Sequence, residues 1–339
     1  MRQWWDSRAK RMALGLFATM SMSLTGHGAI AQEWKPERAV ETVVGVPPGG
    51  PLGISADFVD KWLKTHGYTP PDSIMMPVTG GGHAVATNYV HDKDGDPHYL
   101  QLVVSLLISN ALLGRSELSY RDFTPIAILY DEPMAFAVRA DSEIVDAADL
   151  ARRLTEDPGS VSFSVSSGLG TANHLAVVKL AQSVGADVSK IRAVSFESGP
   201  EGMAAVVGGH IDVAVTPPRN TQQFVESGDL RFIGIVSEER APGDLGDIPT
   251  FIEQGVNVAV SAWRGLVAPP GLTPDQIAFY DNALSAMVAS PEYAQFVAEG
   301  SFTPRYLNSM EAAAFFEARE LEFKDYLSVA GAVQAGAPS

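Results

Sequence analysis

The sequence has 339 residues, of which 46% are hydrophobic and 19% charged, with a formal net charge of −16 and no cysteine. This length exceeds one ordinary hydrophobic core and suits two α/β lobes, and the composition is that of a globular protein. Because the phosphate backbone of a nucleic acid requires a basic surface, the negative charge argues against nucleic acid as a partner.

The first 31 residues have the pattern of an export signal rather than of a folded element. Basic residues gather near the start, residues 12–24 form a modest apolar run, and Ala29 and Ala31 supply a small-x-small cleavage site before Gln32. The apolar run is too short for a stable membrane-spanning helix. The sequence therefore predicts a signal peptide over residues 1–31, cleavage near Ala31/Gln32 and a periplasmic protein, the alternative being a cytosolic protein with a frayed tail.

Strands and helices alternate along the remaining chain. The first region predicts strands at residues 40–46, 74–78, 99–104, 122–130 and 134–138, with helices over 54–65 and from the Gly80-Gly81-Gly82 turn to about 89. The second predicts helices over 146–154, 171–180, 199–207 and 221–226, with strands at 161–165, 192–195, 211–215 and 231–236. The last predicts an extended segment at 258–268 and helices over 274–288, 291–299 and 310–327.

This alternation predicts an α/β fold of two lobes, each a mostly parallel sheet flanked by helices, with ligands at the carboxyl ends of the strands. The chain is expected to leave lobe one near Pro133 and to return near Val260. Lobe one then comprises residues 32–133 plus 261–339, lobe two comprises residues 134–260, and the two crossing strands form a hinge.

Two stretches combine a strand, a small-residue turn and a helix. The stretch at residues 161–180 has Thr171 in position to cap its helix, after a turn that contains Ser166, Ser167, Gly168 and Gly170. Unpaired N–H groups and the dipole at a helix start favour an anion. The turn with Pro48, Gly49 and Gly50 repeats the arrangement. Two such anion-binding sites, called anion seats below, suggest one small anion held between two lobes. Each turn alone is also compatible with an ordinary βα connection.

Seven motifs of this chain recur in the same order in one family: PPGG, GGG, SFSVSSGLGTANHL, VSFESGPEGMAAVVGGHIDVAV, GDLRFIGIVSEER, DIPTFIEQG and SAWRGLVAPPGL. Over residues 40–327 the chain therefore resembles the substrate-binding proteins of tripartite tricarboxylate transporters, the Bug receptors. The resemblance implies a type II periplasmic-binding-protein fold, which closes around its ligand like a Venus flytrap. It also implies capture of a small organic carboxylate and its delivery to a large and a small membrane subunit.

The resemblance further implies that backbone groups and small hydroxyls hold the carboxylate, partly through water. These groups would come from Pro48, Gly49, Gly50, Ser166, Ser167, Gly168 and Thr171. The chain departs from the family pattern where Pro51, Leu52 and Gly53 stand in place of the usual Thr and Asp, and where Thr216-Pro217 replaces Asp-Asn. These differences leave dicarboxylates, tricarboxylates and aromatic acids open as ligands.

Several other residues are candidates with an alternative role. Arg264, beside Trp263, could hold a carboxylate by two parallel hydrogen bonds or form a structural ion pair beneath the crossing strand. Arg219 could contact the ligand or solvent, while His174 is expected to pack or cap rather than bind. The predicted ligand-binding set is Pro48, Gly49, Gly50, Pro51, Leu52, Gly82, His83, Ser105, Ser166, Ser167, Gly168, Gly170, Thr171, His174, Phe196, Thr216, Arg219, Trp263 and Arg264.

Catalytic motifs are missing from the sequence. Ser166 or Ser167 with His174 could be imagined as a hydrolase pair, but no G-x-S-x-G elbow, H-E-x-x-H motif, Walker loop or Cys/His metal spacing occurs. We therefore predict a monomeric binding protein with no catalytic residue, no cofactor and no metal. A carboxylate-sensing receptor for a membrane signalling partner is the alternative function.

Overall fold

The structure is a computed structural model that describes residues 34–331 except 167, 169, 197–198 and 261. The predicted signal peptide and its cleavage site lie outside the described residues, as does Ser167.

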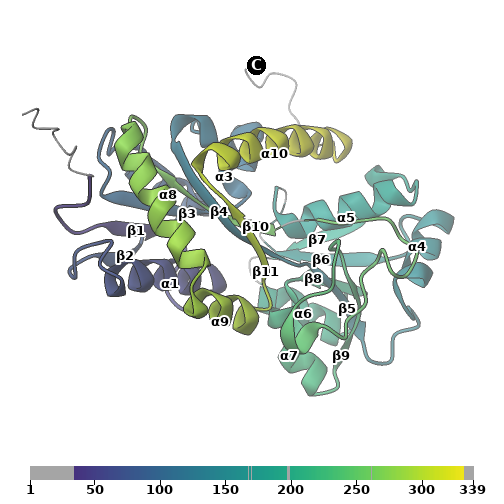
Figure 1. The fold of residues 1–339 in the computed structure, drawn as a ribbon. Coiled ribbons are helices and arrows are strands. Elements are labelled where there is room, and N and C mark those ends of the chain that lie inside the picture. The colour runs from purple at the N-terminus through teal and green to yellow at the C-terminus, as the bar shows by residue number, and fades with distance from the viewer. Residues whose placement is uncertain (1–33, 167, 169, 197–198, 261, 332–339) are drawn as a thin grey trace, which may run out of the picture. The chain divides into compact units, whose positions relative to one another are not determined.

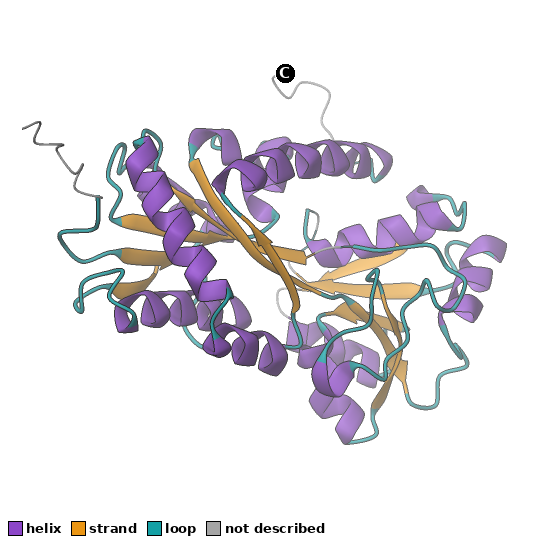
Figure 2. Ribbon diagram, in the orientation of Figure 1, coloured by secondary structure: helices purple, strands orange, loops and turns teal. Residues whose placement is uncertain are grey.

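A six-stranded mixed sheet is built from two separate stretches of chain (Figures 1 and 2). Its strand order is β11-β4-β10-β3-β1-β2. β1, β2 and β3 pair in parallel, whereas β10 is antiparallel to both β3 and β4, and β11 is antiparallel to β4. The strands are β1 (Glu41–Val44), β2 (Ile74–Pro77), β3 (Tyr99–Val103), β4 (Thr124–Glu132), β10 (Ala262–Ala268) and β11 (Thr303–Leu307).

A five-stranded mixed sheet is built from the continuous stretch between β4 and β10, in the order β7-β6-β8-β5-β9. β6 pairs in parallel with β7 and β8, and β5 is antiparallel to β8 and β9. The strands are β5 (Ala135–Arg139), β6 (Ser162–Ser166), β7 (Arg192–Phe196), β8 (Val213–Thr216) and β9 (Leu230–Ile235).

Helices follow most of the strands, and capping residues in the sequence fix where several of them begin. Thr171 and Thr273 each cap a helix through the side chain. The helices are α1 (Pro51–Thr65), α2 (Ala84–His91), α3 (Leu106–Leu112), α4 (Ala147–Glu156), α5 (Ala172–Ser183), α6 (Gly199–Val207), α7 (Pro218–Glu226), α8 (Pro274–Val288), α9 (Pro291–Gly300) and α10 (Ser309–Val329). Within the described ranges, no helix is both long enough and apolar enough to cross a bilayer.

The structure differs from the sequence-based expectation in three respects. The sheets are mixed rather than mostly parallel, because β4, β5, β10 and β11 run antiparallel to their neighbours. α1 begins at Pro51 rather than near residue 54, since proline at the first helical position is already set at a helical φ. α3 and β11 were not expected, because both are short and neither has a clear period.

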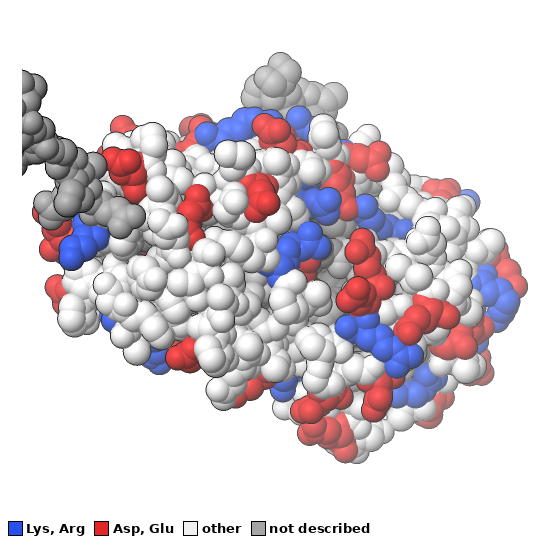
Figure 3. All heavy atoms as spheres, viewed as in Figure 1, with Lys and Arg blue, Asp and Glu red and all other residues white. Residues whose placement is uncertain are grey.

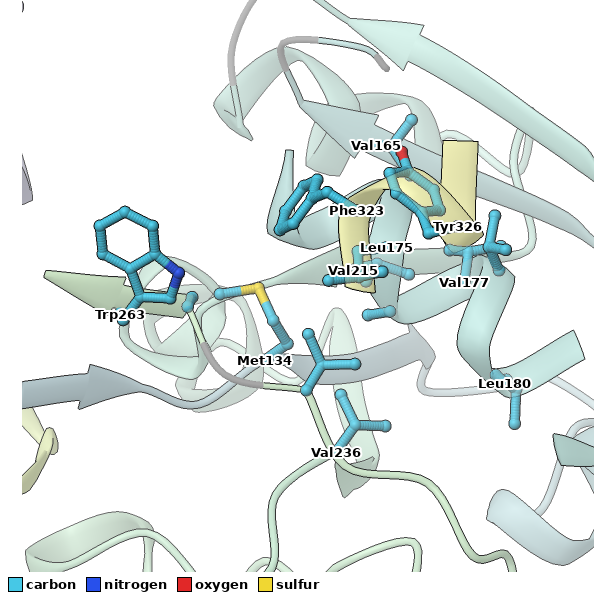
Figure 4. Packing of buried hydrophobic residues seen from close by; sticks show 14 of the residues in the cluster. Met134, Val165, Leu175, Val177, Leu180, Val215, Val236, Trp263, Phe323 and Tyr326 are labelled. Carbon is cyan, nitrogen blue, oxygen red and sulfur yellow. The ribbon is translucent and has the colours of Figure 1, made fainter. Parts of the chain in front are cut away.

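The longest helix among the described residues, α10, packs against β4, β11, α3 and α5. Its residues Phe323 and Tyr326 are 1% and 0% exposed. Figure 4 shows them beside Val165 and Leu175, in a core cluster that also contains residues of the six-stranded sheet such as Val43. One apolar cluster therefore joins α10 to the strand and helix that flank the second glycine turn.

Candidate functional site

The first predicted turn, Pro48 to Gly50, leads directly into α1. Gly50 is the N-cap residue with an extended backbone, and its carbonyl accepts a hydrogen bond from the Ile54 N–H at 2.9 Å. Gly49 has a φ of +89°, and a β-carbon built there would meet no atom within 4 Å, so the space beside it is open. Pro48 and Pro51 are exposed, but the Leu52 side chain is 7% exposed and belongs to the core of the six-stranded sheet. Leu52 therefore packs in the core rather than at the surface of this turn.

The GGG turn lies against the end of β1. Gly80, Gly81 and Gly82 have φ values of +127°, +57° and +58°, and His83 follows at +77°. A β-carbon on Gly45, the residue after β1, would lie 2.8 Å from Cγ of His83. The glycine at position 45 thus allows His83 to pack there, which places the GGG turn beside the strand that leads to the first turn.

The second predicted turn is organised by its helix cap. The Thr171 hydroxyl donates to the Gly168 carbonyl at 2.9 Å, and Thr171 caps α5 by accepting from the His174 N–H. The predicted Thr171 cap is thus confirmed. Gly168 and Gly170 have φ values of +74° and +91°, a conformation that glycine adopts without strain.

Helix α3 contacts two of the glycine turns through adjacent residues. Asn110 Nδ2 donates to the Gly82 carbonyl at 2.9 Å. A β-carbon on Gly170 would lie 2.7 Å from Oγ of Ser109, so the second turn sits directly on α3. Ser105, a predicted site residue, precedes this helix without a side-chain cap hydrogen bond and is 8% exposed. Sequence reasoning missed Ser109 and Asn110, because the helix that carries them was not recognised.

Arg264 forms the structural ion pair that was one of its two expected roles. Its guanidinium pairs with Glu132 and donates to the carbonyls of Ala262 and Trp263 at 3.0 and 3.2 Å. The side chains of Arg264 and Glu132 are 13% and 4% exposed. Burial raises the pKa of the Glu132 carboxyl, and the charge of Arg264 opposes that rise. Trp263 is 1% exposed and packs against Phe316, so its ring belongs to the core.

The remaining candidates are engaged within the fold. His174 is 9% exposed, and its Nδ1 lies 2.5 Å from the Tyr326 hydroxyl, as expected for a packed histidine. Thr216 is 4% exposed and accepts from Asn220 at 3.1 Å. Arg219 is exposed and donates to the Ser301 hydroxyl at 3.2 Å. Phe196 packs at the edge of a core cluster around Met203.

Two cavities are lined by other parts of the chain. One, of about 330 Å³, lies between α1 and α9 and is lined by residues including Phe58, Trp62 and Phe296. The other, of about 380 Å³, is lined by residues from both predicted chain crossings, including Pro133 and Val260. Figure 3 shows acidic and basic side chains interspersed over one face of the molecule, without a continuous basic patch on that face.

Acid is expected to destabilise the protein through His83 and His174. Burial lowers the pKa of both side chains to about 4, with the charge of Arg264 contributing at His83. In the unfolded chain they titrate near pH 6.5, so the unfolded state binds their protons first. Their contribution to stability is fully present above about pH 6.5 and is lost as the pH falls toward 4. Thermal unfolding between pH 7 and 4.5 should show this decline. The His83→Asn/His174→Gln variant should show a flatter profile, and an unchanged slope would contradict the assignment.

Comparisons with known proteins agree with this fold. A model described as the tripartite tricarboxylate transporter family receptor matches residues 73–325. A Pseudomonas sp. (strain P51) protein, named the UPF0065 protein in the tcbD-tcbE intergenic region, is 26% identical over 289 residues, or 82% of each chain. The structure titled R. palustris Rpa4515 with adipate has a TM-score of 0.74 at 20% identity and covers 87% of this chain and 98% of that one. The structure of MatC from Rhodopseudomonas palustris with bound malate has a TM-score of 0.67 at 22% identity. The match covers 87% of this chain and 99% of that one.

These structures share the fold of this chain, so the predicted α/β fold of the periplasmic-binding-protein type is confirmed, with mixed sheets. The matching family consists of receptors, which agrees with the prediction that the chain is not an enzyme. Since the family model spans most of the sequence and six of the seven motifs lie within the matched residues, the chain belongs to the tripartite tricarboxylate transporter receptor family.

Proposed function

We propose that this protein is an exported, monomeric periplasmic receptor that binds a small organic carboxylate between two lobes. Lobe one would comprise residues 32–133 plus 261–339 and lobe two residues 134–260, with the hinge near Pro133 and Val260. The loaded receptor would deliver its ligand to the large and small membrane subunits of a tripartite tricarboxylate transporter. Family membership supports this general role.

The observation that carries the binding proposal is the association of the glycine turns. The second turn rests on Ser109 of α3, while Asn110 of the same helix holds the GGG turn. His83 then connects the GGG turn to the end of β1. The GGG turn and the second turn thus share α3 as a neighbour. Backbone N–H groups at helix starts are suited to an anion, which supports the proposal.

The charges of the protein favour backbone donors over a charged clamp. The net charge of −16 repels an anionic ligand at long range, so attraction must come from local dipoles. Arg264 already has a carboxylate partner in Glu132 and donates to two carbonyls. A ligand carboxylate would therefore be held mainly by the turns at residues 48–50 and 166–171.

The ligand class that we favour is a short dicarboxylic acid. Two relatives of the same fold are described with adipate and with malate. Both acids carry two carboxylates, which matches two anion seats. Tricarboxylates and aromatic acids are the competing ligands.

Purified residues 32–339 should bind one of these acids, and valine at either turn should weaken that binding at least tenfold, or about 1.4 kcal/mol. A β-branched side chain at Gly49 or Gly168 would fill the space beside the turn and restrict its backbone. Thermal shift against a carboxylic-acid library identifies the ligand, because a ligand that binds only the folded state raises the unfolding midpoint. Titration calorimetry then compares the variants.

Gly67→Val is the matched control for these substitutions. Gly67 has a φ of +73° with no atom near the added β-carbon, so it introduces the same backbone strain away from the turns. If the Gly49 and Gly168 variants bind as tightly as the Gly67 variant, backbone capture at the turns is wrong. If no acid in the library shifts the unfolding midpoint, the carboxylate assignment itself is wrong.

A further inference from the structure

The hydroxyl of Tyr326 lies where α10 meets the second glycine turn. Tyr326 is 0% exposed and comes from the core face of α10 (Figure 4). The Gly170 N–H donates to its oxygen at 3.1 Å, and His174 Nδ1 lies 2.5 Å from the same oxygen. One hydroxyl therefore contacts both the residue before the α5 cap and a residue in the first turn of α5.

The direction of each hydrogen bond follows from the groups involved. A backbone N–H can only donate, so the Tyr326 oxygen accepts from Gly170. The Tyr326 proton is then free to be donated to His174 Nδ1, which requires a neutral imidazole with its own proton on Nε2. Burial lowers the pKa of His174 to about 4, which keeps the imidazole neutral at pH 7.

The second turn is held from two directions. Within its own sheet, Thr171 donates to Gly168, and Asn173 donates to the Val215 carbonyl at 2.7 Å. From the other side, Tyr326 holds the Gly170 amide, and α10 also packs on β4 and α3 of the six-stranded sheet. The orientation of the turn therefore depends on a helix that is seated on the opposite sheet.

We propose that Tyr326 is a positioning residue for carboxylate binding, because its hydroxyl accepts from Gly170 within the turn to which the proposed function assigns the anion. This inference rests on the proposed function of the turn. Binding at the turn then requires α10 to be packed in place, so this helix takes part in ligand capture without touching the ligand.

Tyr326→Phe tests the inference, because it keeps the ring and removes the hydroxyl. Tyr280→Phe is the matched control, since Tyr280 is also 0% exposed and its hydroxyl donates to the Pro97 carbonyl at 2.5 Å, away from the glycine turns. We expect both variants to lose some thermal stability. Only Tyr326→Phe should weaken binding of adipate, malate or the acid selected by the library, by about tenfold or more.

Two further measurements separate positioning from a general loss of stability. Amide hydrogen exchange at Gly170 in the ligand-free protein should accelerate in Tyr326→Phe and not in Tyr280→Phe. His174→Leu removes the proton acceptor but leaves the bond from Gly170, so it should weaken binding less than Tyr326→Phe does. If Tyr326→Phe does not fold, His174→Leu is compared with Tyr280→Phe instead. Weaker binding by His174→Leu then supports the positioning role, and equal binding overturns it.

The outcomes distinguish the two proposals. If the unmodified protein binds a carboxylic acid and Tyr326→Phe binds it as tightly as Tyr280→Phe does, the positioning role is wrong and the proposed function stands. Unchanged exchange at Gly170 in Tyr326→Phe would also overturn the positioning role. If the unmodified protein binds none of the acids, the proposed function fails, and the positioning role that rests on it fails too.

Discussion

Replacing Arg264 with methionine is expected to lower the free energy of unfolding by about 3–5 kcal/mol, because it leaves a buried carboxylate without its partner. Glu132 is 3% exposed and pairs with the Arg264 guanidinium across β4 and β10. Methionine preserves an unbranched side chain while removing the charge. Urea unfolding at pH 7 would measure the loss, provided that circular dichroism shows a native spectrum.

The pH dependence of this variant has a definite sign. Without Arg264, burial raises the pKa of Glu132 without opposition, so the folded state binds the proton more strongly than the unfolded state does. As the pH falls below the raised pKa of Glu132 in the folded variant, the unfolding free energy of the variant should therefore approach that of the parent. As the pH rises, the difference between the two unfolding free energies should grow. The control is the Glu132→Gln/Arg264→Met double variant, whose neutral amide should recover part of the loss at pH 7.

Ligand binding by the same variant decides between the two roles of Arg264. A structural Arg264 predicts nearly normal affinity in whatever fraction stays folded. A charge-assisted contact with the ligand predicts a loss of about 1.5–3 kcal/mol. If Arg264→Met abolishes binding while remaining as stable as the parent, the ion pair is not its main role and a charged clamp replaces the backbone model.

Gly170→Ala is expected to lower the free energy of unfolding by about 2–5 kcal/mol, through two separate effects. An L-residue at a φ of +91° adds roughly 1–2 kcal/mol of backbone strain. The new β-carbon would also lie 2.7 Å from Oγ and 2.8 Å from Cβ of Ser109, and overpacking of this kind adds roughly 1–3 kcal/mol. Denaturant unfolding measures the sum.

The Gly185→Ala variant separates these two effects. Gly185, just after α5, has a φ of +71° and no atom within 4 Å of an added β-carbon, so only the backbone strain applies. Gly170→Ala should therefore be the less stable of the two. Adding Ser109→Gly to Gly170→Ala removes the colliding atoms, so the stability of this double variant should lie closer to that of Gly185→Ala. Equal stability of the two alanine variants would show that the second turn does not rest closely on α3.

Local sequence signals predicted the elements that have a clear hydrophobic periodicity or are bounded by capping and turn residues. The Thr171 cap and the strand, turn and helix order around it are present, because a cap and its helix are only a few residues apart. The order of motifs along the chain also pointed to the family that the comparison with known proteins shows.

Contacts between distant residues could not be predicted in this way. The bond from Gly170 to Tyr326 joins residues 156 positions apart, and the Arg264–Glu132 pair spans 132 positions. No periodic pattern links such partners, because they meet only when the sheets and α10 are packed. For the same reason, the sequence could propose two roles for Arg264 but could not choose between them.

The strand order of the six-stranded sheet has a consequence for how a newly made chain folds. β4 lies between β10 and β11, which are made more than a hundred residues later, whereas all five strands of the other sheet lie between Ala135 and Ile235. The five-stranded sheet can therefore assemble first, while β4 still has two unpaired edges. Apolar residues of β4 that are buried in the finished fold, such as Ile126 and Leu129, stay exposed during that interval. They and the unpaired strand edges can then associate with other chains. The growing chain is thus most prone to aggregate after β4 has emerged and before β11 is available.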